Sequence, residues 1–96
     1  MSTRKKQMSV ERESKEFVEI DVLLDGTVLL DDVQFSVVPT FARPTVWVAA
    51  VMSNGRTAVL IDGTVLGKGR YHVYAKYAPT GGPESPVIEA VQVNVV

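Results

Sequence analysis

Residues 70–77 read Arg-Tyr-His-Val-Tyr-Ala-Lys-Tyr, and Gly67 and Gly69 come shortly before them. Closely spaced glycines are typical of a turn, and the run that follows alternates between apolar or aromatic side chains and polar ones. Such alternation predicts a β-strand with one buried and one solvent-facing side. We therefore expect Tyr71 and Val73 to face inward and Tyr74 to face outward.

The rest of the chain after residue 16 consists of short strand-like runs with turn signals between them. The predicted strands cover residues 17–24, 27–30, 33–38, 45–52, 57–61, 70–78 and 87–96. Residues 64–66 are a further candidate for a short strand. Asp25-Gly26 and Asn54-Gly55 are dipeptides that favour two-residue hairpin turns. No run after residue 17 has helical periodicity. About seven short strands in 96 residues predict one all-β domain.

Four residues occupy positions that are diagnostic in an immunoglobulin-like β-sandwich. In antibody domains two cysteines pack against a tryptophan, and a tyrosine two residues before the second cysteine bonds to upstream backbone at a chain corner. Phe35, Trp47 and Val73 stand here at the Cys, Trp and Cys positions, and Tyr71 stands at the corner. The pattern predicts an antiparallel immunoglobulin-like sandwich with Trp47 in its core.

The N-terminal segment differs in composition from the remainder. Residues 1–16 carry five basic and three acidic side chains, whereas residues 17–96 carry five basic and eight acidic ones. After Met1, only Met8 and Val10 in the segment are large and apolar, too few to offset the entropy of ordering it. The sequence therefore predicts a polar N-terminal arm over residues 1–16, flexible or ordered by a partner, with no strand, and a β-sandwich domain over residues 17–96.

Residue patterns that carry catalysis or bind cofactors are absent from the sequence. There is no cysteine, which excludes disulfides and thiolate metal sites. His72 is the only histidine, and acid–base or metal chemistry would need further partner groups. Asp25 and Asp62 each precede Gly-Thr-Val-Leu, so turn chemistry accounts for them without a calcium site. We expect no enzyme activity, no metal and no cofactor.

Charge and hydropathy also restrict the partners. The acidic body argues against general nucleic-acid binding, which needs a broad basic face. The apolar runs are short and interrupted, so no membrane-spanning segment is predicted. The first 16 residues lack the apolar stretch of a secretory signal peptide.

The strand predicted at residues 45–52 is apolar on both faces. If Trp47 points inward, alternation turns Val51 inward as well and turns Val46, Val48 and Met52 outward. Tyr74 of the neighbouring strand also faces outward. An exposed apolar patch is typical of an interaction surface. The predicted interface residues are Val46, Val48, Met52 and Tyr74, together with the basic residues Arg4, Lys5 and Lys6 of the arm, which would lie on an acidic neighbour.

Two segments carry a resemblance to a known family. Residues 69–77 read Gly-Arg-Tyr-His-Val-Tyr-Ala-Lys-Tyr, and residues 83–88 read Pro-Glu-Ser-Pro-Val-Ile. They resemble the LtfC-like β-sandwich family of actinobacterial phages, in which a Gly-x-Tyr-x-Val-Trp-Ala-Lys strand precedes a Pro-Glu-x-Pro-Val loop. Tyr74 stands where Trp is common in that family, and Gly81-Gly82 lengthens the loop. The match covers roughly residues 17–96 and is most specific over residues 69–91.

The resemblance implies a structural or accessory protein of the virion, assembled in the host cytoplasm. The expected function is that of a head accessory or decoration protein that binds the major capsid protein and self-associates in the particle. A tail component, either tube or tip, is the alternative within the particle. A surface- or carbohydrate-binding sandwich module on the virion is the other alternative, and it would need several exposed aromatic residues in one groove.

Overall fold

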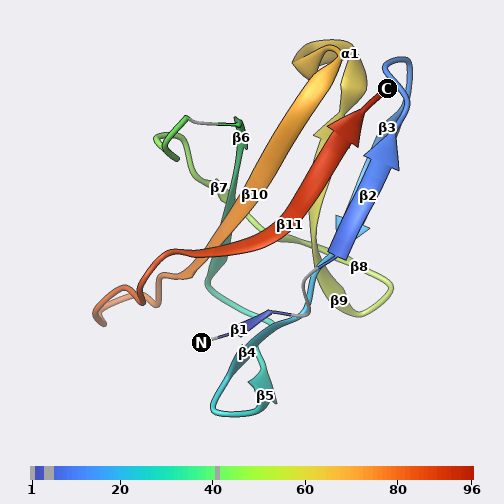
Figure 1. Ribbon diagram of the computed structural model, residues 1–96. Coiled ribbons are helices and arrows are strands. Elements are labelled where there is room, and N and C mark those ends of the chain that lie inside the picture. Colours follow the sequence, from blue (N-terminus) through green and yellow to red (C-terminus); the bar gives the residue numbers. More distant parts are fainter. Residues whose placement is uncertain (1, 4–5, 41) are drawn as a thin grey trace.

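The computed structural model, drawn in Figure 1, describes residues 2–3, 6–40 and 42–96. Side chains are described from Met8 onward. Within the described residues the chain forms eleven β-strands and a single helical turn. The all-β class predicted from the sequence is therefore confirmed. The strands belong to three sheets.

The largest sheet has five strands. In spatial order they are β2 (Lys6–Val10), β11 (Ile88–Val95), β10 (Gly69–Tyr77), β6 (Val33–Pro39) and β7 (Val48–Ala49). The pairs β11–β10, β10–β6 and β6–β7 are antiparallel, whereas β2 runs parallel to β11, as the two arrows in Figure 1 show. The sequence predicted only antiparallel pairing, so the β2–β11 pair is a departure from it.

Two three-stranded sheets complete the fold. One has the order β3 (Lys15–Glu19), β9 (Arg56–Asp62) and β8 (Val51–Ser53), and the other has the order β1 (Ser2–Thr3), β4 (Val22–Leu24) and β5 (Thr27–Val28). Both predicted two-residue hairpins are present, at Asp25-Gly26 between β4 and β5 and at Asn54-Gly55 between β8 and β9. All four turn residues have positive φ angles, the geometry of type I′ turns.

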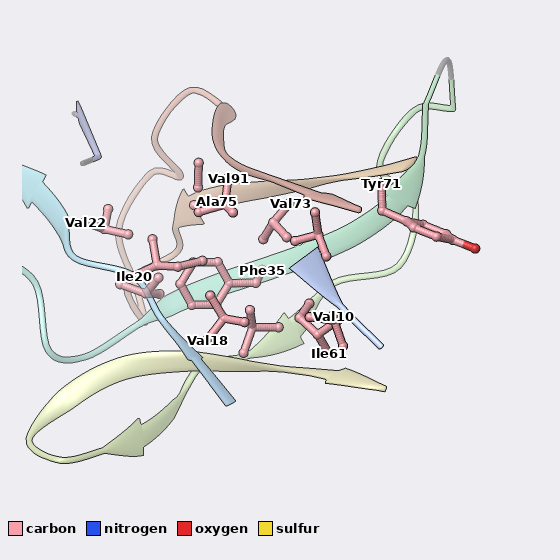
Figure 2. Close-up of a cluster of buried hydrophobic side chains, with 14 of the residues drawn as sticks. Val10, Val18, Ile20, Val22, Phe35, Ile61, Tyr71, Val73, Ala75 and Val91 are labelled. Carbon is pink, nitrogen blue, oxygen red and sulfur yellow. The ribbon is translucent and has the colours of Figure 1, made fainter. Parts of the chain in front are cut away.

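One hydrophobic core joins the five-stranded sheet to the β3-β9-β8 sheet (Figure 2). Phe35 of β6 is fully buried at its centre, and Val73 of β10 is also fully buried. Val18 of β3 and Ile61 of β9 enter the same cluster from the other sheet. Burying these apolar side chains stabilises the fold by about 1.5–3 kcal/mol each.

The N-terminal segment contributes to this core. Residues 6–10 form β2 beside β11, and the Val10 side chain is 1% exposed. The prediction that no strand precedes residue 17 is therefore wrong. The edge of β11 offers backbone partners to β2, and a single valine at the right register reaches the core. Sequence composition could not reveal either contact, because both depend on a strand more than 80 positions away.

Two predicted strands are each divided between two sheets. The run at residues 17–24 breaks at Ile20 and Asp21, so that β3 and β4 join different sheets. The run at residues 45–52 breaks at Ala50, whose N–H donates to the Val33 carbonyl at 2.9 Å, between β7 in one sheet and β8 in another. Alternation continues only along an unbroken strand, so the inward and outward faces predicted for 45–52 do not hold.

The break at Ala50 also affects the predicted position of Trp47. This residue precedes β7 outside any strand and is only half-buried, and the Nζ of Lys76 lies 4.5 Å from the centre of its ring. Lys76 alternates with the fully buried Ala75 on β10, so Trp47 lies on the outer face of the five-stranded sheet. The prediction that Trp47 forms a core pin with Phe35 and Val73 is wrong for the tryptophan.

Tyr71 occupies a corner at the start of β10. Its side chain is buried, and its hydroxyl donates to the carbonyl of Leu66 and lies 3.1 Å from the carbonyl oxygen of Gly67. This upstream backbone contact is the one that the Gly-x-Tyr pattern predicts. The segment it bonds to is the end of helix α1 (Gly63–Leu66), which replaces the short strand considered for residues 64–66.

Candidate interaction surface

An apolar stripe crosses the outer face of the β3-β9-β8 sheet and continues onto β7. Phe17 of β3 and Leu60 of β9 face each other in register, with 58% and 45% of their surfaces exposed. Val51 of β8 is 44% exposed and Val48 of β7 is 50% exposed, and both line one groove with Leu60. We call Phe17, Leu60, Val51 and Val48 the apolar stripe. Contiguous exposed apolar side chains of this kind mark protein-binding surfaces.

Ionic contacts frame the stripe at both ends of the sheet. At one end the Nζ of Lys15 lies 3.7 Å from Asp62. At the other end Arg56 bonds to Glu19 at 2.8 Å and to Asp21 at 3.0 Å. Exposed ion pairs contribute little to stability individually. They lie at the two ends of the sheet and leave the apolar centre of its face uncovered.

The framing groups have shifted pKa values. The Asn54 side chain donates to Glu19 at 2.8 Å and is the largest cause that lowers the pKa of this carboxyl, with Ser53 and Arg56 acting in the same direction. The pKa of Asp62 is lowered mainly by the Thr64 hydroxyl, which donates to it at the start of α1. Both carboxylates are therefore held in the charged form.

The outer face of the five-stranded sheet has a different character. His72 Nδ1 lies 3.0 Å from a carboxylate oxygen of Glu89, and the His72 and Tyr74 rings lie 6.3 Å apart. Lys76, which lies over the Trp47 ring, bonds to Glu84 at 2.9 Å. This face combines aromatic rings with paired charges, whereas the apolar stripe carries neither histidine nor tryptophan.

The predicted interface residues are spread over several places. Arg4 and Lys5 lie outside the described residues, and Lys6 is described only through its backbone in β2. Val46 and Met52 are exposed, and Val48 belongs to the apolar stripe. Tyr74 is half-buried on the outer face of β10, in a different sheet from Val51 and Leu60. The structure does not gather these residues into one patch.

Three stripe residues were missed by the sequence analysis, namely Phe17, Val51 and Leu60. A signal was present for Phe17, which shares the polar side of the alternation with Glu19 and Asp21. Val51 was expected to face inward with Trp47, and the break at Ala50 reverses that expectation. Leu60 alternates with Val59 and Ile61, which are both buried in the core.

Further features of the described residues bear on function. No group of three or more His, Asp or Glu side chains among them is placed to hold a metal ion. Within the same part of the chain, no helix has the length and apolar character to cross a membrane. Comparisons with known protein families, with curated proteins and with solved structures found no match.

Proposed function

We propose that the chain is a structural protein of a bacteriophage particle, a head accessory or decoration protein that binds the major capsid protein. The observation that carries this proposal is the apolar stripe. Four large apolar side chains lie together on an otherwise acidic domain, and a partner that covers them gains about 25 cal/mol for each Å² of apolar surface removed from water. The resemblance of residues 69–91 to the LtfC-like family supplies the particle context.

We further propose that the five-stranded sheet and the β3-β9-β8 sheet form an immunoglobulin-like sandwich. Support comes from the Tyr71 corner and from Phe35 and Val73, which pack in one core from neighbouring strands. A cysteine-free sandwich of this size is suited to assembly in the host cytoplasm and to self-association of copies in the particle.

Copy counting in purified particles tests the placement. Heads and tails are separated, and peptides of this chain are quantified by mass spectrometry against the major capsid protein. Many copies in the head fraction support decoration. Many copies in the tail fraction indicate a tube protein, a few indicate a tip component, and absence from both fractions refutes a virion role.

A binding experiment tests the surface. Purified variants are added to particles that lack the protein, and bound copies are measured after sedimentation. Val48→Asp should lose binding because it buries an unpaired charge at the interface. Val65→Asp is the matched control, since Val65 is 78% exposed on α1, outside the stripe. Equal binding by both variants would assign the interface to another surface.

A second candidate function is a surface- or carbohydrate-binding module on the virion. The observation that favours it is that Trp47 shares the outer face of the five-stranded sheet with Tyr74 and His72. Aromatic rings on one face can stack on planar or apolar ligand surfaces. Binding of the purified chain to host cell walls, abolished by Trp47→Ala and retained by Val48→Asp, would favour this function over decoration.

A further inference from the structure

Among the described residues, Leu60 of β9 has a neighbouring strand on the β3 side but none on the β8 side. β8 pairs with β9 only from Ser53 back to Val51, which lies opposite Ala58, while β9 continues to Asp62 (Figure 1). The chain before β8 turns away, because the Ala50 N–H donates to Val33 in the other sheet. Within the described part of the chain, the β8-facing edge of β9 therefore has no paired strand from Val59 to Asp62.

The direction of the backbone groups follows from the ladder on the other side of β9. The Thr57 carbonyl accepts from the Ile20 N–H on the β3 side, at 2.9 Å. In a strand, N–H and C=O groups of successive residues point to opposite sides. Those of Ala58 and Leu60 therefore point to the β8 side, where Ala58 meets Val51.

Leu60 has no corresponding strand residue on that side within the described part of the chain. If the β8–β9 pairing continued, Ala49 would lie opposite Leu60. Ala49 instead pairs with Gln34 of β6. The edge at Leu60 thus presents one backbone donor and one acceptor toward open space. An edge of this kind is a template for a further strand.

The space beside this edge is an apolar groove of about 330 Å³. It is lined by Val48, Ala49, Val51, Ala58, Val59 and Leu60, none of which carries a charge. Backbone groups in such surroundings gain more from a hydrogen-bonding partner than they would in open water. The lining therefore suits an uncharged occupant that also supplies backbone donors and acceptors.

The size of the surface decides between a second copy and a single segment. Strands β9, β3 and β8 have seven, five and three residues. At about 3.4 Å per residue and about 4.8 Å between strands, they give a sheet face of about 250 Å². Stable interfaces bury about 800 Å² on each partner. The face is too small for a stable dimer, but it is wide enough for one extended chain.

We propose that this groove binds an extended, uncharged segment of a partner protein, which adds as a strand along Leu60 and places apolar side chains against Val48 and Val51. This mode takes affinity from main-chain hydrogen bonds and specificity from the side-chain groove. It rests on the proposed function in one respect, that the domain works by binding another protein.

A peptide titration of the isolated chain followed by NMR tests the proposal. The probe is an acetylated, amidated pentapeptide of alternating threonine and valine, at millimolar concentration. The expected result is movement of the Leu60 amide signal and those of the groove residues, with slower hydrogen exchange at Leu60. The same peptide N-methylated on its backbone nitrogens keeps its side chains but cannot donate, and it should not bind.

Two variants at Leu60 separate the backbone from the side chain. Leu60→Ala removes the side chain and keeps the N–H, whereas Leu60→Pro removes both, and proline is tolerated where the N–H faces an open edge. Leu60→Pro should bind about tenfold more weakly than Leu60→Ala, with similar denaturation midpoints. If the proline variant does not fold, the N-methylated peptide decides the question on the parent protein.

Three results would overturn the proposal. They are an absence of shifts at millimolar peptide, equal binding of the N-methylated peptide, and groove shifts that grow with protein concentration alone, which indicate a second copy. These results concern the isolated chain, so they are independent of copy counting in particles. A protein found in heads that does not bind the peptide would retain the proposed function and lose only this inference.

Discussion

Tyr71→Phe isolates the contribution of the corner hydrogen bond. The change removes one oxygen from a buried side chain and leaves the ring in place. The carbonyl of Leu66 loses its donor at the end of α1, where the Gly67 N–H already bonds to Gly63 at 3.0 Å. An unsatisfied buried acceptor costs about 1–3 kcal/mol, and this bond is part-buried, so we expect a loss near the lower end of that range, about 1 kcal/mol. A domain of this size has only about 5–15 kcal/mol in total, so the loss is measurable.

Urea unfolding followed by tryptophan fluorescence and by circular dichroism is the suitable assay. With an m value of about 1–3 kcal/mol/M for a small protein, the midpoint should fall by up to about 1 M. Tyr74→Phe is the control, because it removes the same oxygen from a half-buried side chain on the outer face of β10, and its midpoint should stay close to that of the parent. Equal midpoints for Tyr71→Phe and the parent would refute the corner as a stabilising contact.

Four further predictions concern the core, the turns and the charges. Phe35→Ala should lower the free energy of unfolding by about 3–5 kcal/mol because Phe35 is fully buried. Trp47→Ala should cost well under half as much because Trp47 is half-buried on an outer face. Comparable urea midpoints for the two variants would contradict this. Gly63→Ala should destabilise the protein by about 1–3 kcal/mol in the same assay, since a Cβ there would overlap the backbone of Glu11 and Arg12. Ser36→Ala should leave the free energy of unfolding unchanged or raise it by up to about 1 kcal/mol, because the buried Ser36 Oγ meets no hydrogen-bond partner among the described residues. A clear loss of stability would show that this hydroxyl is satisfied. The lowered pKa of Glu19 means that folding favours its charged form, so the stabilisation is complete above the ordinary value of 4.5 and is lost as pH falls through the lowered value. The difference in stability between the parent and Glu19→Gln should accordingly be largest at neutral pH and shrink in acid, and a constant difference would contradict the assignment.

The candidate surface was only partly predictable from the sequence. Val48 is exposed, as predicted, but not on the predicted face: it pairs with Phe35 and lies on the core-facing side of the five-stranded sheet, at the edge strand β7. Leu60 and Val51 were not found, since their exposure depends on the chain leaving one sheet for another at Ala50. No local pattern marks that crossing, as every residue from Val46 to Met52 is apolar.

Local chemistry in the sequence was sufficient to determine the β-class, both two-residue hairpins and the inward face of β10. Each of these depends on residues close together in the chain: alternation along one strand, positive φ at Asp25-Gly26 and Asn54-Gly55, and the five-residue reach of the Tyr71 hydroxyl to Leu66. The tertiary structure alone decided that β2 joins the core, that Trp47 lies outside it, and that no described strand pairs with Leu60 on the β8 side of β9. These outcomes depend on which distant strand offers free backbone groups and space, a competition among long-range contacts that composition and periodicity do not encode.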